Sequence, residues 1–133
     1  PVNNRHFSDR PGSDASSIGV FLTGSTYTGH NGYSLRLYGL DHGYNDKAYN
    51  RTIVIHQALY VSEAFIKKYG RLGRSWGCFA LENGLGIEIM NTIKDGSIIL
   101  AYYPDRKWIE SSKFTKPKKY TLIMNPTKIW QPR

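Results

Sequence analysis

Hydrophobic and polar positions in the first 40 residues predict a pair of strands. Residues 18–23 are an apolar run, and residues 33–40 alternate apolar and polar side chains with the period of two of a half-buried strand. The segment between them is rich in glycine and contains Asn31-Gly32, which suits the positive backbone angles of a turn. We therefore expect a β-hairpin.

The pattern changes to short helices and further strands after residue 50. Residues 52–56 are predicted as a buried, β-branched strand that ends at His56. Ser62 is a good N-cap and Gly70 a good stop for a helix over residues 63–69, and an apolar repeat predicts a second helix over 86–93. Further strands are predicted at residues 79–81, 97–103 and 120–124.

Many strands with two short helices indicate a mainly β protein, either a sandwich or a pair of mixed sheets. The length of 133 residues suits a single domain over residues 1–133. Neither a GxGxxG nor a GxxxxGK[ST] string occurs, so dinucleotide-binding and P-loop classes are excluded.

The charge balance narrows the kinds of partner. Eighteen Lys and Arg residues against ten Asp and Glu residues give a net charge of +8, which favours acidic or polyanionic partners. No nucleic-acid-binding motif or Cys/His zinc pattern accompanies this charge, so we expect neither nucleic acid nor a metal or other cofactor. No apolar run reaches the roughly 20 residues of a membrane span, and the first residues lack a signal-peptide core.

The only cysteine lies in a segment suited to a nucleophile. With one cysteine the chain has no intramolecular disulfide, and this thiol is either a small buried hydrophobe or a reactive group. Gly77, which precedes Cys78, permits close approach of a substrate to the backbone, whose N–H groups bind an oxyanion. The cations Arg71 and Arg74 upstream favour the thiolate.

A thiol nucleophile needs a base, and His56 is the best of four histidines. His30 and His42 lie in polar, turn-like segments, and His6 is near the chain start. His56 ends an apolar strand, so a rigid element holds its imidazole. By itself His56 is equally well explained as a hydrogen-bonded core histidine, and the pair with Cys78 suggests only a generic cysteine acyl-transfer enzyme.

The sequence resembles the murein L,D-transpeptidase catalytic domains, which are related to the wider YkuD group. The resemblance runs over residues 6–103, and its specific part is the pair of strings IVIH and GRLGRSWGC at this separation. It implies a β-sandwich of mixed sheets with two short helices. It also implies that Cys78 is the nucleophile, that His56 is the general base, and that Ser75, Trp76 and Gly77 form the motif at the oxyanion site.

The resemblance implies a cysteine-dependent transfer of peptidoglycan tetrapeptide stems through a thioester, giving 3→3 crosslinks. Arg71, Arg74 and Tyr33 are the candidates for substrate binding. Such an enzyme is expected outside the bacterial cytoplasm, in the periplasm or its equivalent, as a monomer that carbapenems acylate.

Departures from the family pattern leave alternatives open. Trp76 stands where many relatives of the broader group have histidine, Phe79 replaces a proline, and Gln57 replaces a glycine. Family domains carry strands upstream of the point where this chain begins, so either the domain is trimmed or its edge is supplied differently. The alternatives are an L,D-carboxypeptidase or endopeptidase of the same fold and a non-catalytic wall-binding module. The group that orients His56 is a backbone carbonyl or a residue such as Asn45 or Asp46.

Overall fold

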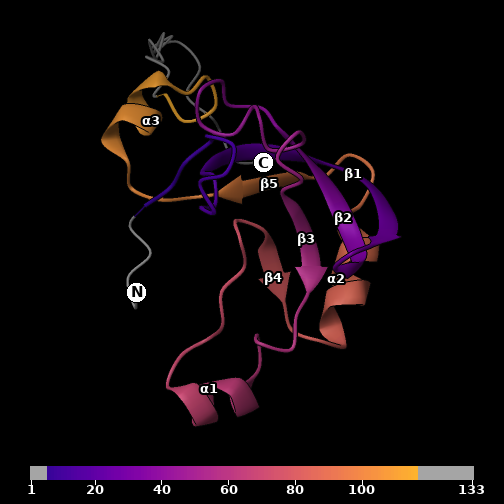
Figure 1. The fold of residues 1–133 in the computed structure, drawn as a ribbon. Helices are drawn as coiled ribbons and strands as arrows, with labels where there is room; N and C mark the ends of the chain where they lie inside the picture. The colour runs from indigo at the N-terminus through magenta and orange to yellow at the C-terminus, as the bar shows by residue number, and fades with distance from the viewer. Residues whose placement is uncertain (1–5, 117–133) are drawn as a thin grey trace, which may run out of the picture.

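A curled five-stranded mixed sheet is the centre of the molecule (Figure 1). The computed structural model describes residues 6–116, and the strand order is β4-β3-β2-β1-β5. Only β3 and β4 run parallel; the other neighbours are antiparallel. In chain order the elements are β1 (Gly19–Gly29), β2 (Gly32–Gly39), β3 (Val54–Gln57), α1 (Glu63–Tyr69), β4 (Phe79–Leu81), α2 (Leu85–Ile93), β5 (Ile98–Ala101) and α3 (Arg106–Ser111).

The predicted hairpin is confirmed and forms the longest part of the sheet. β1 pairs with β2 from Phe21 to Gly29, and only His30 and Asn31 connect the two strands. Gly32 follows with a φ of 74°, a left-handed angle that glycine adopts at little cost. The predicted helices over 63–69 and 86–93 are also present, as α1 and α2.

The two faces of the sheet have different roles because side chains alternate along each strand. One face packs against α2 and holds the hydrophobic core, which includes Phe21, Leu35, Leu37, Ile55 and Met90. The opposite face carries the polar residues Ser34 and His56, both buried. The core thus fixes the strands from one side and leaves the other side for polar side chains.

The fold prediction was correct in class but not in every detail. The protein is mainly β, but a sandwich is not confirmed, since the described residues form one sheet. Residues 6–116 contain three helices rather than two: Asp105 caps α3 by accepting a hydrogen bond from the Trp108 amide, and Trp108 is fully buried. The strand predicted at residues 120–124 lies outside the described residues.

A buried carboxylate holds α3 against the sheet. Asp41 accepts hydrogen bonds from the Val20 amide (2.8 Å), the Trp108 indole (3.2 Å) and the Ser112 hydroxyl (2.5 Å). One donor lies in β1 and the other two belong to α3 and its C-cap, so all three are distant from Asp41 along the chain and local sequence signals do not reveal the arrangement. Among the described residues, no helix is both long enough and apolar enough to cross a membrane.

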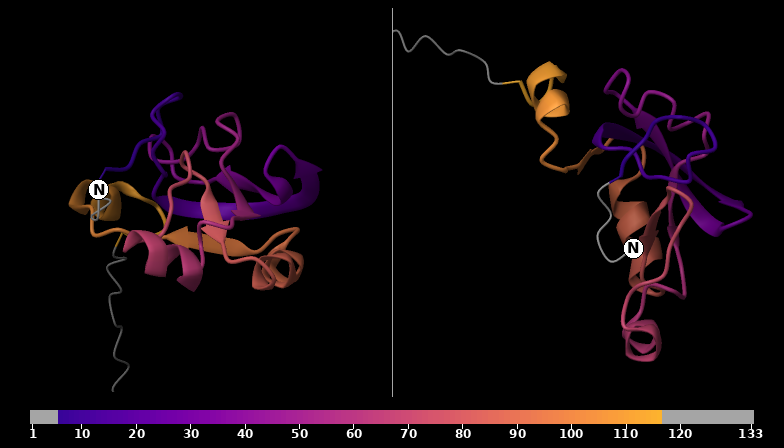
Figure 2. Two further views of the ribbon diagram at one scale, coloured as in Figure 1. Left: turned by 60° about the horizontal axis from the view of Figure 1, so that its bottom comes forward. Right: turned by 60° about the vertical axis from the view of Figure 1, so that its left-hand side comes forward.

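Two helices lie at opposite ends of the molecule. α3 lies at one end of the sheet and α1 projects from the other, beyond the ends of β3 and β4 (Figures 1 and 2). α1 has no buried residue, whereas α2 buries Gly86 and Met90 against the sheet. The connection between β3 and β4 is therefore an excursion from the fold rather than a core element.

Candidate active site

The parallel pairing of β3 and β4 brings the predicted nucleophile and base to one pocket. Ile55 pairs with Phe79 and His56 pairs with Ala80. Cys78 directly precedes Phe79, and its thiol contacts the backbone at Thr52 and Val54, immediately before and at the start of the strand that carries His56. Cys78 and His56 are diagonal neighbours across the two strands, although they are far apart in the sequence.

Both residues line a pocket of about 560 Å³. Four further segments contribute to its walls: the N-terminal loop, the β1–β2 turn, the residues before β3, and the excursion between β3 and β4. The lining residues from these segments are Asp14, His30, Asn31, Arg51, Thr52, Tyr60, Arg74, Ser75 and Trp76. The site is thus an open, polar pocket with one thiol and one buried imidazole.

His56 is held in one orientation by its own strand. The residue is only 6% exposed, and its Nδ1 lies 2.8 Å from the carbonyl oxygen of Gln57. A carbonyl accepts but does not donate, so Nδ1 carries the proton and Nε2 is the basic nitrogen of the neutral ring. Of the orienting groups left open by the sequence, the backbone carbonyl is therefore the one present. Asp46 instead binds His42 at 2.9 Å, and Asn45 bonds with Asp41 and Val20.

The thiol of Cys78 is half-buried. Burial raises its pKa above the ordinary thiol value and outweighs the two influences that lower it, a hydrogen bond from the Val54 backbone and the positive charge of Arg51. Sγ lies 3.5 Å from the carbonyl oxygen of Thr52, to which the thiol donates. Cys78 is therefore a neutral thiol at neutral pH and needs a base when it reacts.

Gly77 and Ser75 set the backbone shape on the N-terminal side of the thiol. Gly77 is buried at a φ of 105°, and a Cβ there would lie 2.8 Å from the Ala15 carbonyl oxygen and 2.8 Å from Ile53 Cδ1. Any side chain would displace the loop from its neighbours. The Ser75 hydroxyl donates to the Cys78 carbonyl at 2.5 Å, which closes the turn around Trp76 and Gly77.

Arg51 is the most important residue of the site that the sequence patterns did not reveal. Its guanidinium donates to the Ser8 carbonyl (2.7 Å), Ser17 Oγ (2.7 Å), Ser13 Oγ (3.1 Å) and the Ala15 carbonyl (2.7 Å). The side chain is only 5% exposed and lies 3.8 Å from the Asp9 carboxylate. Arg51 thus ties the N-terminal loop, residues 8–17, against the pocket and is also the cation that acts on the thiol.

Thr52, beside Arg51, has an unusual backbone conformation. Its φ is 55°, a value that costs a β-branched residue on the order of 1–3 kcal/mol. The carbonyl of this residue accepts the hydrogen bond from Cys78. A strained residue in contact with the only thiol is consistent with a functional site, and no sequence pattern signals it.

The predicted substrate-binding residues have different positions. Arg74 lines the thiol pocket, as do Ser75 and Trp76 of the predicted oxyanion motif. Arg71 lines a neighbouring pocket of about 500 Å³ that shares Asp14, Arg74 and Ser75 with the first. Tyr33 does not line either pocket: its hydroxyl donates to Asn91 Oδ1 at 2.6 Å and also lies 3.0 Å from the Thr26 hydroxyl.

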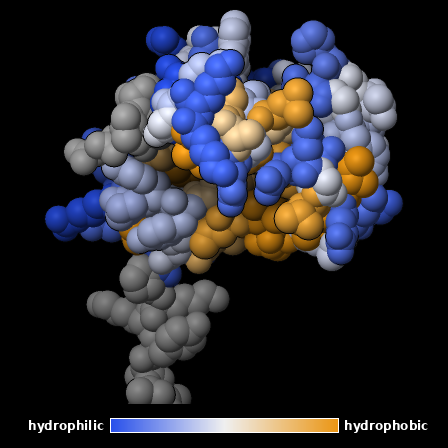
Figure 3. All heavy atoms as spheres, turned by 90° about the horizontal axis from the view of Figure 1, so that it is seen from below, coloured by the Kyte–Doolittle hydropathy of each residue, from blue (hydrophilic) through white to orange (hydrophobic). Residues whose placement is uncertain are grey.

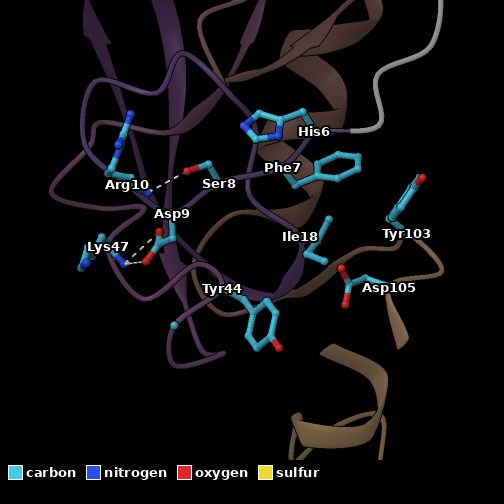
Figure 4. Close-up of a pocket in the computed structure, with 11 residues that line it drawn as sticks. His6, Phe7, Ser8, Asp9, Arg10, Ile18, Tyr44, Lys47, Tyr103 and Asp105 are labelled. Atoms are coloured by element: carbon cyan, nitrogen blue, oxygen red, sulfur yellow. Dashed lines mark hydrogen bonds between the residues drawn. The ribbon is translucent and has the colours of Figure 1, made fainter. Parts of the chain in front are cut away.

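A third pocket, of about 530 Å³, lies along the N-terminal loop (Figure 4). Phe7, Tyr44 and Tyr103 line it together with Lys47 and Arg10, and Phe7 packs on Tyr103 with 4.7 Å between ring centroids. It contains neither Cys78 nor His56. Within residues 6–116 no group of three or more His, Cys, Asp or Glu side chains is arranged to hold a metal ion.

The family model for the L,D-transpeptidase catalytic domain matches residues 2–102. The chain belongs to this family. The matched segment includes every strand of the sheet and both His56 and Cys78. Comparison with curated proteins and with solved structures finds no match.

Proposed function

We propose that the protein is an L,D-transpeptidase with a cysteine nucleophile that acts on the tetrapeptide stems of peptidoglycan. The observation that carries the proposal is the shared pocket of Cys78 and His56, in which the Gln57 carbonyl leaves Nε2 of His56 as the base. Family membership supports the peptidoglycan theme and a transferase activity.

The first half of the proposed reaction forms a thioester. His56 Nε2 takes the Cys78 proton as sulfur attacks the carbonyl between the third residue of the stem and its terminal D-alanine. Backbone N–H groups near Gly77 and Cys78 stabilise the oxyanion. The C–N bond then breaks, and His56 returns the proton to the amine of the departing D-alanine.

The second half transfers the acyl group. The side-chain amine of an acceptor stem attacks the thioester, gives up its proton through His56, and releases the Cys78 thiol. The product is a 3→3 crosslink. When water attacks instead, the product is a tripeptide stem and the enzyme acts as an L,D-carboxypeptidase.

The raised pKa of Cys78 favours this proton-transfer sequence over a preformed thiolate–imidazolium pair. Arg74 and Trp76, which line the pocket, are assigned to the stem, with Arg74 facing its carboxylates. Arg71, from the neighbouring pocket, supplements this charge. We place the enzyme outside the cytoplasm, where peptidoglycan lies, and treat residues 1–133 as one catalytic domain that acts as a monomer.

The test is intact-mass measurement after incubation with a carbapenem, whose β-lactam carbonyl captures an acyl-accepting thiol. The wild-type protein should gain one adduct, Cys78→Ala none, and His56→Ala an adduct that forms at least roughly a hundredfold more slowly. His42→Ala is the matched control, because His42 is exposed and bonds only to Asp46. A folded wild-type protein that gains no adduct would favour the wall-binding alternative.

A second assay separates the two enzymatic outcomes. Tetrapeptide muropeptides are incubated with the protein and the products separated by chromatography and mass. Crosslinked dimers with loss of D-alanine support transpeptidation. Tripeptides without dimers would instead identify an L,D-carboxypeptidase.

A further inference from the structure

The excursion between β3 and β4, residues 58–77, is called the arm here, and it has an unusual surface. The Ala58 amide donates to the Leu81 carbonyl and holds the base of the arm to β4, and the Gly73 amide donates to the Tyr60 carbonyl and joins the two sides of the arm, both at 2.9 Å. Beyond this base α1 buries no residue. The arm is therefore anchored at its base, and most of the residues in and around α1 are exposed to solvent.

The exposed side chains of the arm are of two kinds. Leu59, Ile66, Tyr69 and Leu72 are large apolar or aromatic residues that are 43–79% exposed. Lys67, Lys68, Arg71 and Arg74 are exposed cations, and Glu63 is the only acidic residue of residues 58–77. Large apolar residues gathered in this way on a surface mark an interaction site rather than ordinary solvent exposure.

The exposed apolar surface is not confined to the arm. Figure 3 views the molecule from the side to which α1 points, and hydrophobic residues gather over a broad part of this face next to strongly hydrophilic ones. Leu85, Ile87 and Ile89 of α2 are also exposed. The exposed apolar residues of the arm and of α2 together are therefore more than a few isolated side chains.

We propose that the arm docks the protein onto the surface of an anionic lipid bilayer. Cations pair with anionic headgroups, Leu and Ile side chains enter the boundary between headgroups and acyl chains, and Tyr69 suits the interface. A soluble polyanion would satisfy the cations but not the apolar residues, so the observations favour the bilayer. Because the arm contains Ser75 and leads directly into Cys78, docking holds the thiol pocket close to the membrane surface.

The experiment is co-sedimentation of the full chain with vesicles of phosphatidylcholine alone or mixed with phosphatidylglycerol. The wild type should bind the anionic vesicles and not the neutral ones. Each cation near an anionic surface changes partitioning about fivefold, so Lys67→Glu with Lys68→Glu should weaken binding by at least about 25-fold. The matched control is Lys107→Glu with Lys113→Glu at the α3 end, which should change binding by roughly threefold or less because salt screens distant charge.

A second pair of substitutions tests whether the apolar residues of the arm contribute to vesicle binding. Ile66→Ser with Leu72→Ser should weaken vesicle binding about tenfold, whereas Phe114→Ser, an exposed control near α3, should not. Thermal unfolding checks that each variant is folded. Equal losses in arm and control pairs, or undiminished binding after Ile66→Ser with Leu72→Ser, would overturn the proposal and indicate non-specific charge or a polyanion.

Acylation by the carbapenem in the absence of vesicles distinguishes this proposal from the proposed function. Lys67 and Lys68 line neither the thiol pocket nor its neighbour, so the Lys67→Glu with Lys68→Glu variant should be acylated at the wild-type rate. If the wild-type protein is acylated but does not bind anionic vesicles, only the docking proposal is contradicted. If the wild-type protein binds the vesicles but is never acylated, only the assignment of Cys78 as nucleophile is contradicted.

Discussion

The thiol pocket lies between two walls that are stabilised in opposite ways. The N-terminal loop has no regular secondary structure, yet Arg51 holds it with four hydrogen bonds and Gly77 packs on its Ala15 carbonyl. The arm contains a helix with good caps at both ends, yet no residue of that helix is buried. We therefore expect rigidity to follow buried contacts rather than helical content.

The largest expected effect comes from removing the arginine that holds the N-terminal loop. Arg51→Ala would leave the Asp9 carboxylate and two backbone carbonyls without their buried partner. Such losses cost about 3–5 kcal/mol of unfolding free energy. Urea unfolding measures the change. Arg74→Ala, an exposed arginine of the arm, is the control and should cost no more than about 0.5 kcal/mol.

The same glycine-to-alanine change should have unequal effects at the last residue of the arm, which packs on the N-terminal loop, and at the exposed end of α1. Gly77→Ala adds a Cβ 2.8 Å from the Ala15 oxygen at a φ of 105°, so we expect a loss of about 1–3 kcal/mol and slower acylation of Cys78. Gly70→Ala, in the arm, also has a positive φ but no neighbour within 4 Å. Its cost should be at most about 1 kcal/mol with acylation unchanged. Equal losses would contradict the comparison.

Helix caps offer a finer test of whether α1 contributes to global stability. Ser62 accepts a hydrogen bond from the Phe65 amide at 3.2 Å, and losing such a cap weakens a helix by about 1 kcal/mol. Because α1 buries nothing, Ser62→Ala should speed hydrogen exchange of the α1 amides while global unfolding changes by less than about 0.5 kcal/mol. Asp105→Ala removes the cap of α3, which buries Trp108, and should lower global stability by about 1 kcal/mol.

The smallest expected effect is on the pKa of the Cys78 thiol, and it tests which wall of the pocket carries the cation that lowers this pKa. Burial raises the pKa of Cys78, and Arg51, not an arginine of the arm, is the cation that lowers it. Alkylation of Cys78 should therefore rise with pH around a midpoint above the ordinary thiol value, and Arg74→Ala should leave this midpoint unchanged. A midpoint below the ordinary value would show a preformed thiolate.

The same raised pKa has a consequence for folding. The neutral thiol is favoured in the folded state, so its stabilising contribution is present below the unfolded-state pKa and is lost as pH rises through the folded-state pKa. The unfolding free energy of the wild type should thus fall relative to Cys78→Ala only in alkaline solution. Urea unfolding at a series of pH values measures the difference.

Much of the fold was predictable because its signals are local. The alternation in residues 33–40, the Asn-Gly turn and the Ser62 and Gly70 caps act over a few residues, and β2, the hairpin and α1 followed from them. α3 was missed because its main stabilising contact is between Trp108 and Asp41, 67 residues apart. Arg51 escaped prediction for the same reason, since its partners are loop residues 34–43 positions away.

By itself the sequence determined the mainly β class, the hairpin, the family, and the pair of residues, Cys78 and His56, worth testing as nucleophile and base. Only the tertiary structure decided that parallel pairing of β3 and β4 places both in one pocket, that the Gln57 carbonyl orients His56, and that Tyr33 lies elsewhere. The physical reason is range: backbone propensity and capping act between near neighbours, whereas burial, charge and hydrogen bonding at the pocket join residues that are distant along the chain.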